Sequence, residues 1–129
     1  MNTPKNLKYA ETDEWISVDG SKGKVGISDY AQDQLSDIVY VEFNKDPGDS
    51  FEKGDVIATI ESVKAAADVN APVSGKVLAI NETIEDTPET LNEDPYDLGW
   101  LFEIELTDTS ELNDLYDADG YDEYCESRD

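Results

Sequence analysis

The chain has 129 residues, no histidine, one cysteine and a formal net charge of −23, because 32 aspartates and glutamates outnumber nine lysines and arginines. A chain of this length fits one domain, residues 1–129, which buries roughly two-thirds of the surface of its unfolded form. Without an imidazole or a second thiol, it lacks the usual catalytic base, redox pair and soft metal ligands. We therefore expect no catalytic residue and no metal site.

The negative charge argues against nucleic acid and anionic membranes as partners, because both repel a polyanion. It indicates either a solvated acidic surface, as in adaptation to high salt, or docking onto basic surfaces of partner proteins. The first interpretation is favoured, because the acidic residues are spread along the whole chain. No apolar run is long enough to cross a bilayer and no signal sequence is visible, so we expect a cytoplasmic protein, or a mitochondrial one after loss of a presequence.

Alternating apolar residues and turn signals predict a mainly β chain. The runs Glu14–Val18 and Gly23–Ile27 predict a first hairpin. Ser28 is predicted to cap a helix over Asp29–Leu35, because its hydroxyl can accept a hydrogen bond from the first helical turn. Another strand is predicted from Asp37 to Phe43.

The runs Asp55–Ile60 and Ala67–Val73 predict a second hairpin with Lys64 at its tip. Gly54 and Gly75 stand almost symmetrically around it, and each is predicted to adopt the backbone angles of a tight bend. Such a hairpin presents one amine to a visiting enzyme.

Two further strands are predicted at Lys76–Ile80 and Gly99–Leu106, with a helical turn near Thr87–Leu91 in the polar segment between them. Ser110 is predicted to open a C-terminal helix, with a last turn after Gly120. Three apolar residues would share one face of this helix: Leu112, Leu115 and Tyr116. Many short strands with turns between them indicate a β-sandwich or flattened barrel with small helices.

The residues around the hairpin tip, Glu61-Ser62-Val63-Lys64-Ala65, look like a lipoylation site. Other motifs follow in order: Leu7-Lys8-Tyr9, Glu14-Trp15, Gly26 to Gln32, Asn70 to Gly75, Asp94-Pro95-Tyr96, Gly99-Trp100 and Ser110-Glu111-Leu112. Together they resemble the H proteins of the glycine cleavage system from end to end. The resemblance implies a barrel-sandwich hybrid of two antiparallel sheets with short peripheral and C-terminal helices, and lipoate on Lys64.

The resemblance also implies a monomeric carrier that is not an enzyme. A lipoate ligase or lipoyl transferase would load the lysine. The arm would then take the aminomethyl group of glycine from a pyridoxal-phosphate-dependent decarboxylase to a tetrahydrofolate-dependent aminomethyltransferase, and a dihydrolipoyl dehydrogenase would reoxidise it. The cofactors supply the chemistry, and the protein supplies position and shelter.

In this family the loaded arm folds back against a cleft, and Glu14 and Asp68 match positions that line it. A carboxylate there can hold the cationic amine of the loaded arm. Asp13, Tyr30 and Gln34 stand where relatives carry histidine, so the chemistry of the cleft is expected to differ. With no imidazole to titrate, both carboxylates are expected to be ionised above about pH 5 if their pKa values are near reference, and the shelter is then expected to change little between about pH 6 and 8.

These residues also have ordinary explanations. Lys64 can be a solvated charge, with Glu61 and Asp68 as weak surface ion-pair partners. Glu14-Trp15 can be a strand segment with a buried indole. Cys125 is more typical of a packed small hydrophobic residue than of a reactive thiol.

Other carrier classes share the hairpin. Biotin carriers typically place methionines around the lysine, and acyltransferase lipoyl domains place aspartate before it, whereas Val63 and Ala65 flank Lys64 here. Two alternatives stay open: an H-like lipoyl carrier in lipoate relay or sulfur metabolism, and an unmodified acidic interaction protein.

Moderate salt is expected to raise the melting temperature of the protein. Counterions screen the mutual repulsion of the acidic residues, and the screening length falls from about 30 Å at 0.01 M salt to about 10 Å at 0.1 M. Thermal unfolding followed by circular dichroism across this range measures the effect. A melting temperature that stays flat would show that repulsion is not a significant term.

Overall fold

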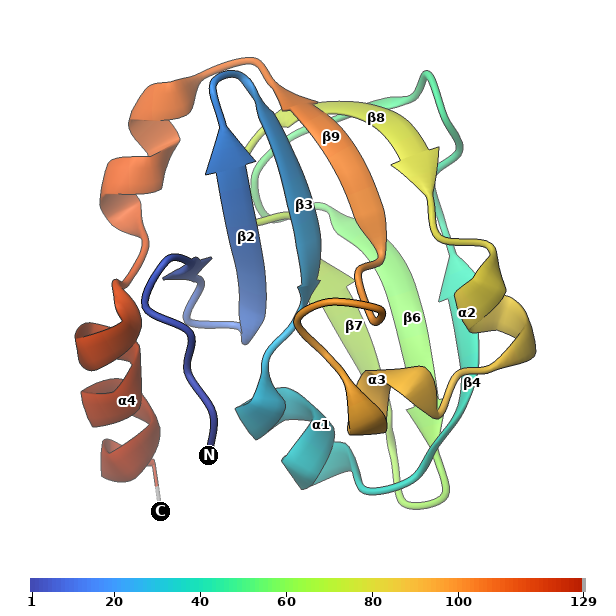
Figure 1. Ribbon diagram of the computed structural model, residues 1–129. Coiled ribbons are helices and arrows are strands. Elements are labelled where there is room, and N and C mark those ends of the chain that lie inside the picture. Colours follow the sequence, from blue (N-terminus) through green and yellow to red (C-terminus); the bar gives the residue numbers. More distant parts are fainter. Residues whose placement is uncertain (129) are drawn as a thin grey trace.

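The computed structural model describes residues 1–128 and contains two antiparallel sheets packed face to face (Figure 1). One sheet has six strands in the order β1-β2-β3-β9-β8-β5, and the other has three in the order β4-β6-β7. The strands are β1 (Lys8–Tyr9), β2 (Glu14–Asp19), β3 (Lys22–Ile27), β4 (Ile38–Phe43), β5 (Ser50–Phe51), β6 (Val56–Ser62), β7 (Ala66–Asn70), β8 (Gly75–Ile80) and β9 (Phe102–Leu106). The predicted mainly β, two-sheet architecture with short helices is confirmed.

The helices lie at the periphery of the sandwich (Figure 1). They are α1 (Asp29–Leu35), α2 (Thr83–Asp86), α3 (Thr90–Glu93), the 3₁₀ helix η1 (Thr109–Asp114) and α4 (Ala118–Ser127). As predicted, Ser28 caps α1, and its Oγ accepts a hydrogen bond from the Ala31 amide at 3.1 Å. Within residues 1–128, no helix has the length and apolarity needed to cross a membrane.

The inner faces of the two sheets share one apolar core. Alternation along each strand sends every second side chain inward, where it leaves water. The six-stranded sheet contributes Ile16, Val25, Val77 and Ile104, and the three-stranded sheet contributes Val41, Ile60 and Val69, each at most 1% exposed. Burial of each such side chain contributes about 1.5–3 kcal/mol relative to exposure, so this core holds the two sheets together.

A second, aromatic cluster lies where α4 covers β1 and β2 (Figure 1). The rings of Tyr9 and Tyr121 stack at 4.7 Å, and Trp15 donates from its indole nitrogen to the Pro95 carbonyl at 2.9 Å. Cys125 is 2% exposed in this cluster, and burial raises the pKa of its thiol. The ordinary explanations of Trp15 as a buried indole and Cys125 as a packed residue are confirmed.

The C-terminal helix differs from the prediction. Ser110 does not open a long helix, because the chain forms the short η1 and then becomes extended at Tyr116. There Tyr116 exchanges two backbone hydrogen bonds with Tyr9, at 2.9 and 2.8 Å. The helix α4 starts afterwards and runs through Gly120, with the side chain of Asp117 accepting from the Gly120 amide. A contact between distant segments therefore overrides the local helical pattern.

Three smaller boundaries also differ. The strand β7 ends at Asn70 and not at Val73, and β9 begins at Phe102 and not at Gly99. Two short helices, α2 and α3, flank Thr87, where one helical turn was expected. Both of these strand ends lie three residues inside the predicted ends, which exceeds the one or two residues by which assignments of an element end usually differ.

The two glycines around the hairpin serve different purposes. Gly54 has a φ of +91°, as the predicted bend requires. Gly75 lies inside β8, and the predicted bend is wrong there. A Cβ at this position would stand 2.4 Å from the backbone oxygen of Glu105 on β9, so Gly75 allows the close approach of two strands.

Replacing Gly75 by alanine is expected to lower the free energy of unfolding by about 1–3 kcal/mol, as overpacking does. The new methyl group would push against a backbone oxygen that cannot rotate away. Urea unfolding measures the change. Ser50→Ala, at an exposed position on the neighbouring strand β5, serves as the control; equal midpoints for the two variants would contradict the prediction.

Candidate functional site: the Lys64 hairpin and its cleft

The turn between β6 and β7 consists of Val63, Lys64 and Ala65. The Ser62 hydroxyl organises it. Its oxygen accepts hydrogen bonds from the backbone amides of Lys64 at 3.1 Å and Ala65 at 2.9 Å, and the hydroxyl donates a hydrogen bond to the Ala65 carbonyl at 3.0 Å. Side-chain bonds of this kind stabilise tight turns. Ser62, predicted only as part of a recognition motif, therefore also shapes the turn that presents the lysine.

Lys64 is exposed at the tip of this turn, and its Nζ donates to the backbone oxygen of Gln34 on α1 at 3.3 Å. Among residues 1–128, no ion pair joins Lys64 to Glu61 or Asp68. Neither of the two surface ion pairs is formed in the described residues, and Lys64 is a solvated charge. The amine lies beside a weak, single acceptor and is open to a reaction partner.

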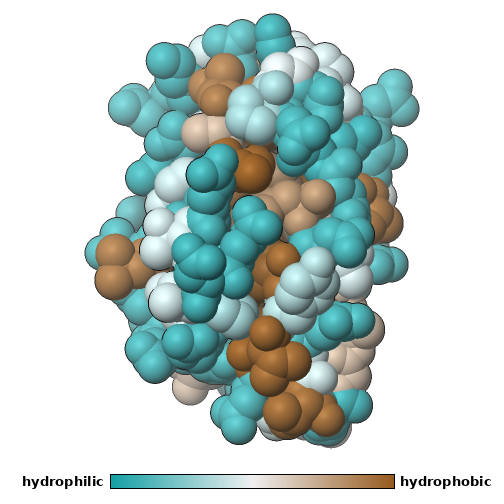
Figure 2. Space-filling model, turned by 90° about the vertical axis from the view of Figure 1, so that its right-hand side faces the viewer, coloured by the Kyte–Doolittle hydropathy of each residue, from teal (hydrophilic) through white to brown (hydrophobic). Residues whose placement is uncertain are grey.

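Two exposed valines lie in the turn and on the neighbouring strand. Val63 is 69% exposed and Val39, on β4, is 53% exposed. The register of β4 against β6 shifts between Ile38 and Tyr40, and such bulges re-aim the side chains that they contain. Figure 2 shows hydrophobic residues together at the lower end of the face that carries β4, where Figure 1 places the β6–β7 turn.

A cleft of about 290 Å³ opens between the start of β2, the helix α1, the strands β6 and β7, and the end of α4. Part of its wall is apolar, with Leu35 and Ile60 among the lining residues. Glu14 and Asp68 also line it, although 53 residues separate them in the chain. The fold thus brings together the two carboxyl residues predicted to share a cleft.

Residues 7–128 match the family model described as glycine cleavage H-protein. The chain belongs to this family. H proteins are non-catalytic lipoyl carriers of the glycine cleavage system and normally carry a lipoyl-lysine. The interpretation of this chain as a carrier of that system, and not an enzyme, is thereby confirmed.

Individual relatives agree over nearly the whole chain. The chain is 53% identical to the glycine cleavage system H protein of Idiomarina loihiensis, covering 94% of each protein. It is 49% identical to the H protein of Thermotoga maritima, and the match covers 94% of this chain and 97% of that protein. It is 46% identical to the mitochondrial H protein 2 of Arabidopsis thaliana, and that match covers 97% of this chain and 80% of the relative. The crystal structure of the Mycobacterium marinum H protein superposes with a TM-score of 0.82 at 30% identity, covering 97% of this chain and 98% of that one.

Glu14 is buried, which is unusual for a carboxyl group. It is 1% exposed, and it accepts hydrogen bonds from the Asn70 amide at 3.0 Å and from the Thr12 hydroxyl. Burial raises the pKa of Glu14 to about 8, against the opposing effect of the two hydrogen bonds. The expectation that Glu14 is ionised above about pH 5 is therefore wrong, because that reasoning treated the carboxyl group as solvated.

The three residues for which the family resemblance led us to expect histidine in relatives all line the cleft: Asp13, Tyr30 and Gln34. Asp13 accepts two hydrogen bonds from Arg128, at 2.7 and 2.9 Å, and one from the Tyr121 hydroxyl at 2.7 Å. Sequence reasoning missed Arg128, since nothing in a terminal arginine indicates a partner 115 residues away.

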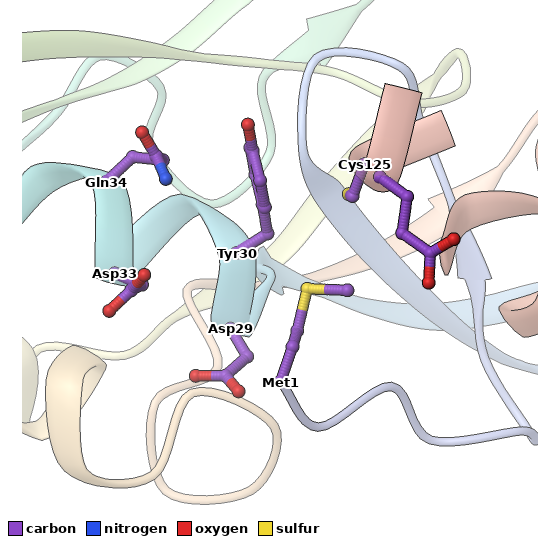
Figure 3. Close-up of a pocket in the computed structure, with 7 residues that line it drawn as sticks. Met1, Asp29, Tyr30, Asp33, Gln34 and Cys125 are labelled. Atoms are coloured by element: carbon purple, nitrogen blue, oxygen red, sulfur yellow. The ribbon is translucent and has the colours of Figure 1, made fainter. Parts of the chain in front are cut away.

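A second cavity, of about 380 Å³, lies on the other side of α1. Figure 3 shows Tyr30 and Gln34 projecting from α1, with Met1 and Cys125 across from them. Because Tyr30 and Gln34 line both cavities, they form part of the partition between them.

Glu14→Gln is expected to remove a pH dependence of stability. The pKa of Glu14 is about 8 in the folded protein and 4.5 by reference, so the folded state binds the extra proton between these values. Its contribution to stability is complete below pH 4.5 and is lost as the pH rises through 8. Relative to Glu14→Gln, wild-type stability should fall by at most about 1.4 kcal/mol per pH unit in this window.

Urea unfolding at several pH values measures this difference. Glu61→Gln makes the same charge change at an exposed position on β6 and serves as the control. Identical pH profiles for the wild type and Glu14→Gln would mean that folding leaves the pKa of Glu14 at its reference value.

Proposed function

We propose that Lys64 carries lipoate in an amide bond on Nζ, and that the arm shuttles the aminomethyl group of glycine between the other components of the glycine cleavage system. The position of Lys64 carries the proposal. It stands at the tip of an ordered turn, with its Nζ 3.3 Å from the Gln34 carbonyl at the border of the cleft. An arm attached there can extend outward or fold back.

The surroundings of the tip suit a lipoate ligase or lipoyl transferase. Glu61 and Ser62 end the strand that leads into the turn, and Val63 and Ala65 flank the lysine. Other lysines are presented differently: Lys53 pairs with Asp114 at 3.2 Å. We propose Glu61, Ser62, Val63 and Ala65 as the recognition motif around Lys64.

The cleft fits the proposed group in its chemistry. When attached, the lipoyl group supplies the disulfide that accepts the aminomethyl group and the reach that carries it. Leu35 and Ile60 can exclude water from the folded-back arm, while Glu14 and Asp68 offer carboxyl oxygens to its amine. A cation beside Glu14 favours the ionised carboxylate, so Glu14 would release its proton as the amine arrives.

We propose three partners for the loaded chain: the pyridoxal-phosphate-dependent decarboxylase, the tetrahydrofolate-dependent aminomethyltransferase and the dihydrolipoyl dehydrogenase. With a net charge of −23, the chain would be steered toward basic surfaces on these enzymes. We further propose that residues 1–129 act as one carrier domain, as a monomer in the cytoplasm, without nucleic acid or membrane partners.

Lys64→Arg is expected to keep the fold and lose both lipoylation and carrier activity, because a guanidinium group is not acylated by the route that acylates an amine. Intact mass after incubation with lipoate ligase, followed by peptide mapping, measures the modification. Lys53→Arg and Lys76→Arg are matched controls and should still gain one lipoyl group. A lipoyl group mapped to Lys53 or Lys76 would sink the assignment, and failure to support the decarboxylase after lipoylation would favour another lipoyl role.

A further inference from the structure

Arg128, directly after α4, makes an unusually complete set of contacts for a residue so near the end of the chain. Its guanidinium donates to both carboxylate oxygens of Asp13, at 2.7 and 2.9 Å. It also lies over the rings of Tyr30, at 4.3 Å, and Tyr124, at 4.8 Å. The paired donors and the flat stacking surface are properties of arginine that lysine does not share.

This contact differs from the other ion pairs of the described residues 1–128. The side chains of Arg128 and Asp13 are 28% and 17% exposed, whereas those of the other three pairs are 39% exposed or more. Exposed pairs contribute little, because water and salt screen them. The Arg128–Asp13 pair is also the one that borders the cleft.

Charged and titratable groups from several elements line the same cleft as Glu14. Asp13 precedes it in the chain, Asp68 comes from β7, Tyr30 from α1 and Arg128 from the end of α4. Within residues 1–128, Arg128 is the one cation among the residues that line the cleft. The other cation nearby is the Lys64 amine, which lies at the border, 3.3 Å from the Gln34 carbonyl, and acylation would remove its charge.

We propose that Arg128 is a positioning residue of the cleft. It fastens the end of α4 to Asp13 at the edge of the cleft and offsets the negative charge of Asp13. Glu14 and Asp68 are then the carboxyl groups left to face the amine of the arm. The part that concerns the arm rests on the proposed function. The arrangement of charges does not, because it belongs to the unmodified protein.

The backbone of Asp13 supports this role. Its φ is +81°, a conformation that is uncommon outside glycine and that aspartate and asparagine adopt more readily than other residues. Such a conformation persists where surrounding contacts hold it, and here the Arg128 fork and the Tyr121 hydroxyl hold the side chain. Because Glu14 is the next residue, a shift of Asp13 would move the carboxyl group that faces the cleft.

The charges act in the same direction. The hydrogen bonds of Asp13 raise the pKa of Arg128, so the guanidinium stays cationic. The charge of Asp13 is one of the smaller influences on Glu14, and it raises the pKa of Glu14. Removing the guanidinium would leave this charge uncompensated and make Glu14 harder to ionise when the amine arrives.

A charge cycle on the unmodified protein tests the proposal. The pKa of Glu14 is followed by the NMR shift of its carboxyl carbon in the wild type, Arg128→Gln, Asp13→Asn and the double variant. Arg128→Gln should raise this pKa, because the charge of the neighbouring Asp13 is then uncompensated. The double variant should return it close to the wild-type value, since both charges are then gone. Asn tolerates a positive φ, so Asp13→Asn is expected to fold.

Arg128→Lys separates charge from geometry. It should keep the pKa of Glu14 near the wild-type value but speed amide hydrogen exchange in the last turn of α4, because the fork and the stacking are lost. If the double variant keeps the raised pKa of Arg128→Gln, Arg128 acts through structure alone and the charge role is overturned. Unchanged exchange in both Arg128 variants would overturn the fastening role.

In the loaded protein, the pH at which the arm becomes protected should move upward together with the pKa of Glu14 in Arg128→Gln. If the pH dependence of arm protection stays the same while the pKa of Glu14 shifts, the link between Arg128 and the arm is overturned. If instead the cycle succeeds and no lipoyl group is found on Lys64 by mass, the proposed function fails and the charge arrangement stands.

Discussion

The packing of the three-stranded sheet against the six-stranded sheet is the interaction on which the rest of this structure depends. The strand β6 lies between β4 and β7, and its buried Ile57 and Ile60 anchor it in the core. The β6–β7 turn continues from that anchored strand, so Lys64 is presented by a rigid support. Functional residues held by packed strands are placed more accurately than residues on free loops.

The carboxyl group of Glu14 joins the two sheets beside the cleft. Glu14 begins β2 in one sheet, and the amide that it binds belongs to Asn70 at the end of β7 in the other. A buried polar group of this kind is tolerated because its hydrogen bonds are made. The same burial disfavours the charged form of Glu14 and raises its pKa to about 8; in the proposed function, an arriving cation would reverse this preference.

Electrostatics acts on two scales in this protein. Across the surface, a net charge of −23 is spread over solvated carboxylates and governs solubility and encounters. Inside the cleft, a few groups decide the local field: the Arg128–Asp13 pair, the buried Glu14 and Asp68. Because the chain has no histidine, the described part of the cleft depends on carboxyl groups and one guanidinium for its charge.

Sequence by itself determined the features that depend on near neighbours. The two hairpins, the Ser28 cap and the place of Lys64 at a turn follow from alternation and local hydrogen bonding, which act over a few residues. Only the tertiary structure decided that Tyr116 is extended, because Tyr9 binds it, and that Gly75 is needed for a close strand approach. It also decided the pKa of Glu14 and the partner of Arg128. Burial and contacts between residues more than a hundred positions apart depend on the folded path of the chain, which local patterns do not encode.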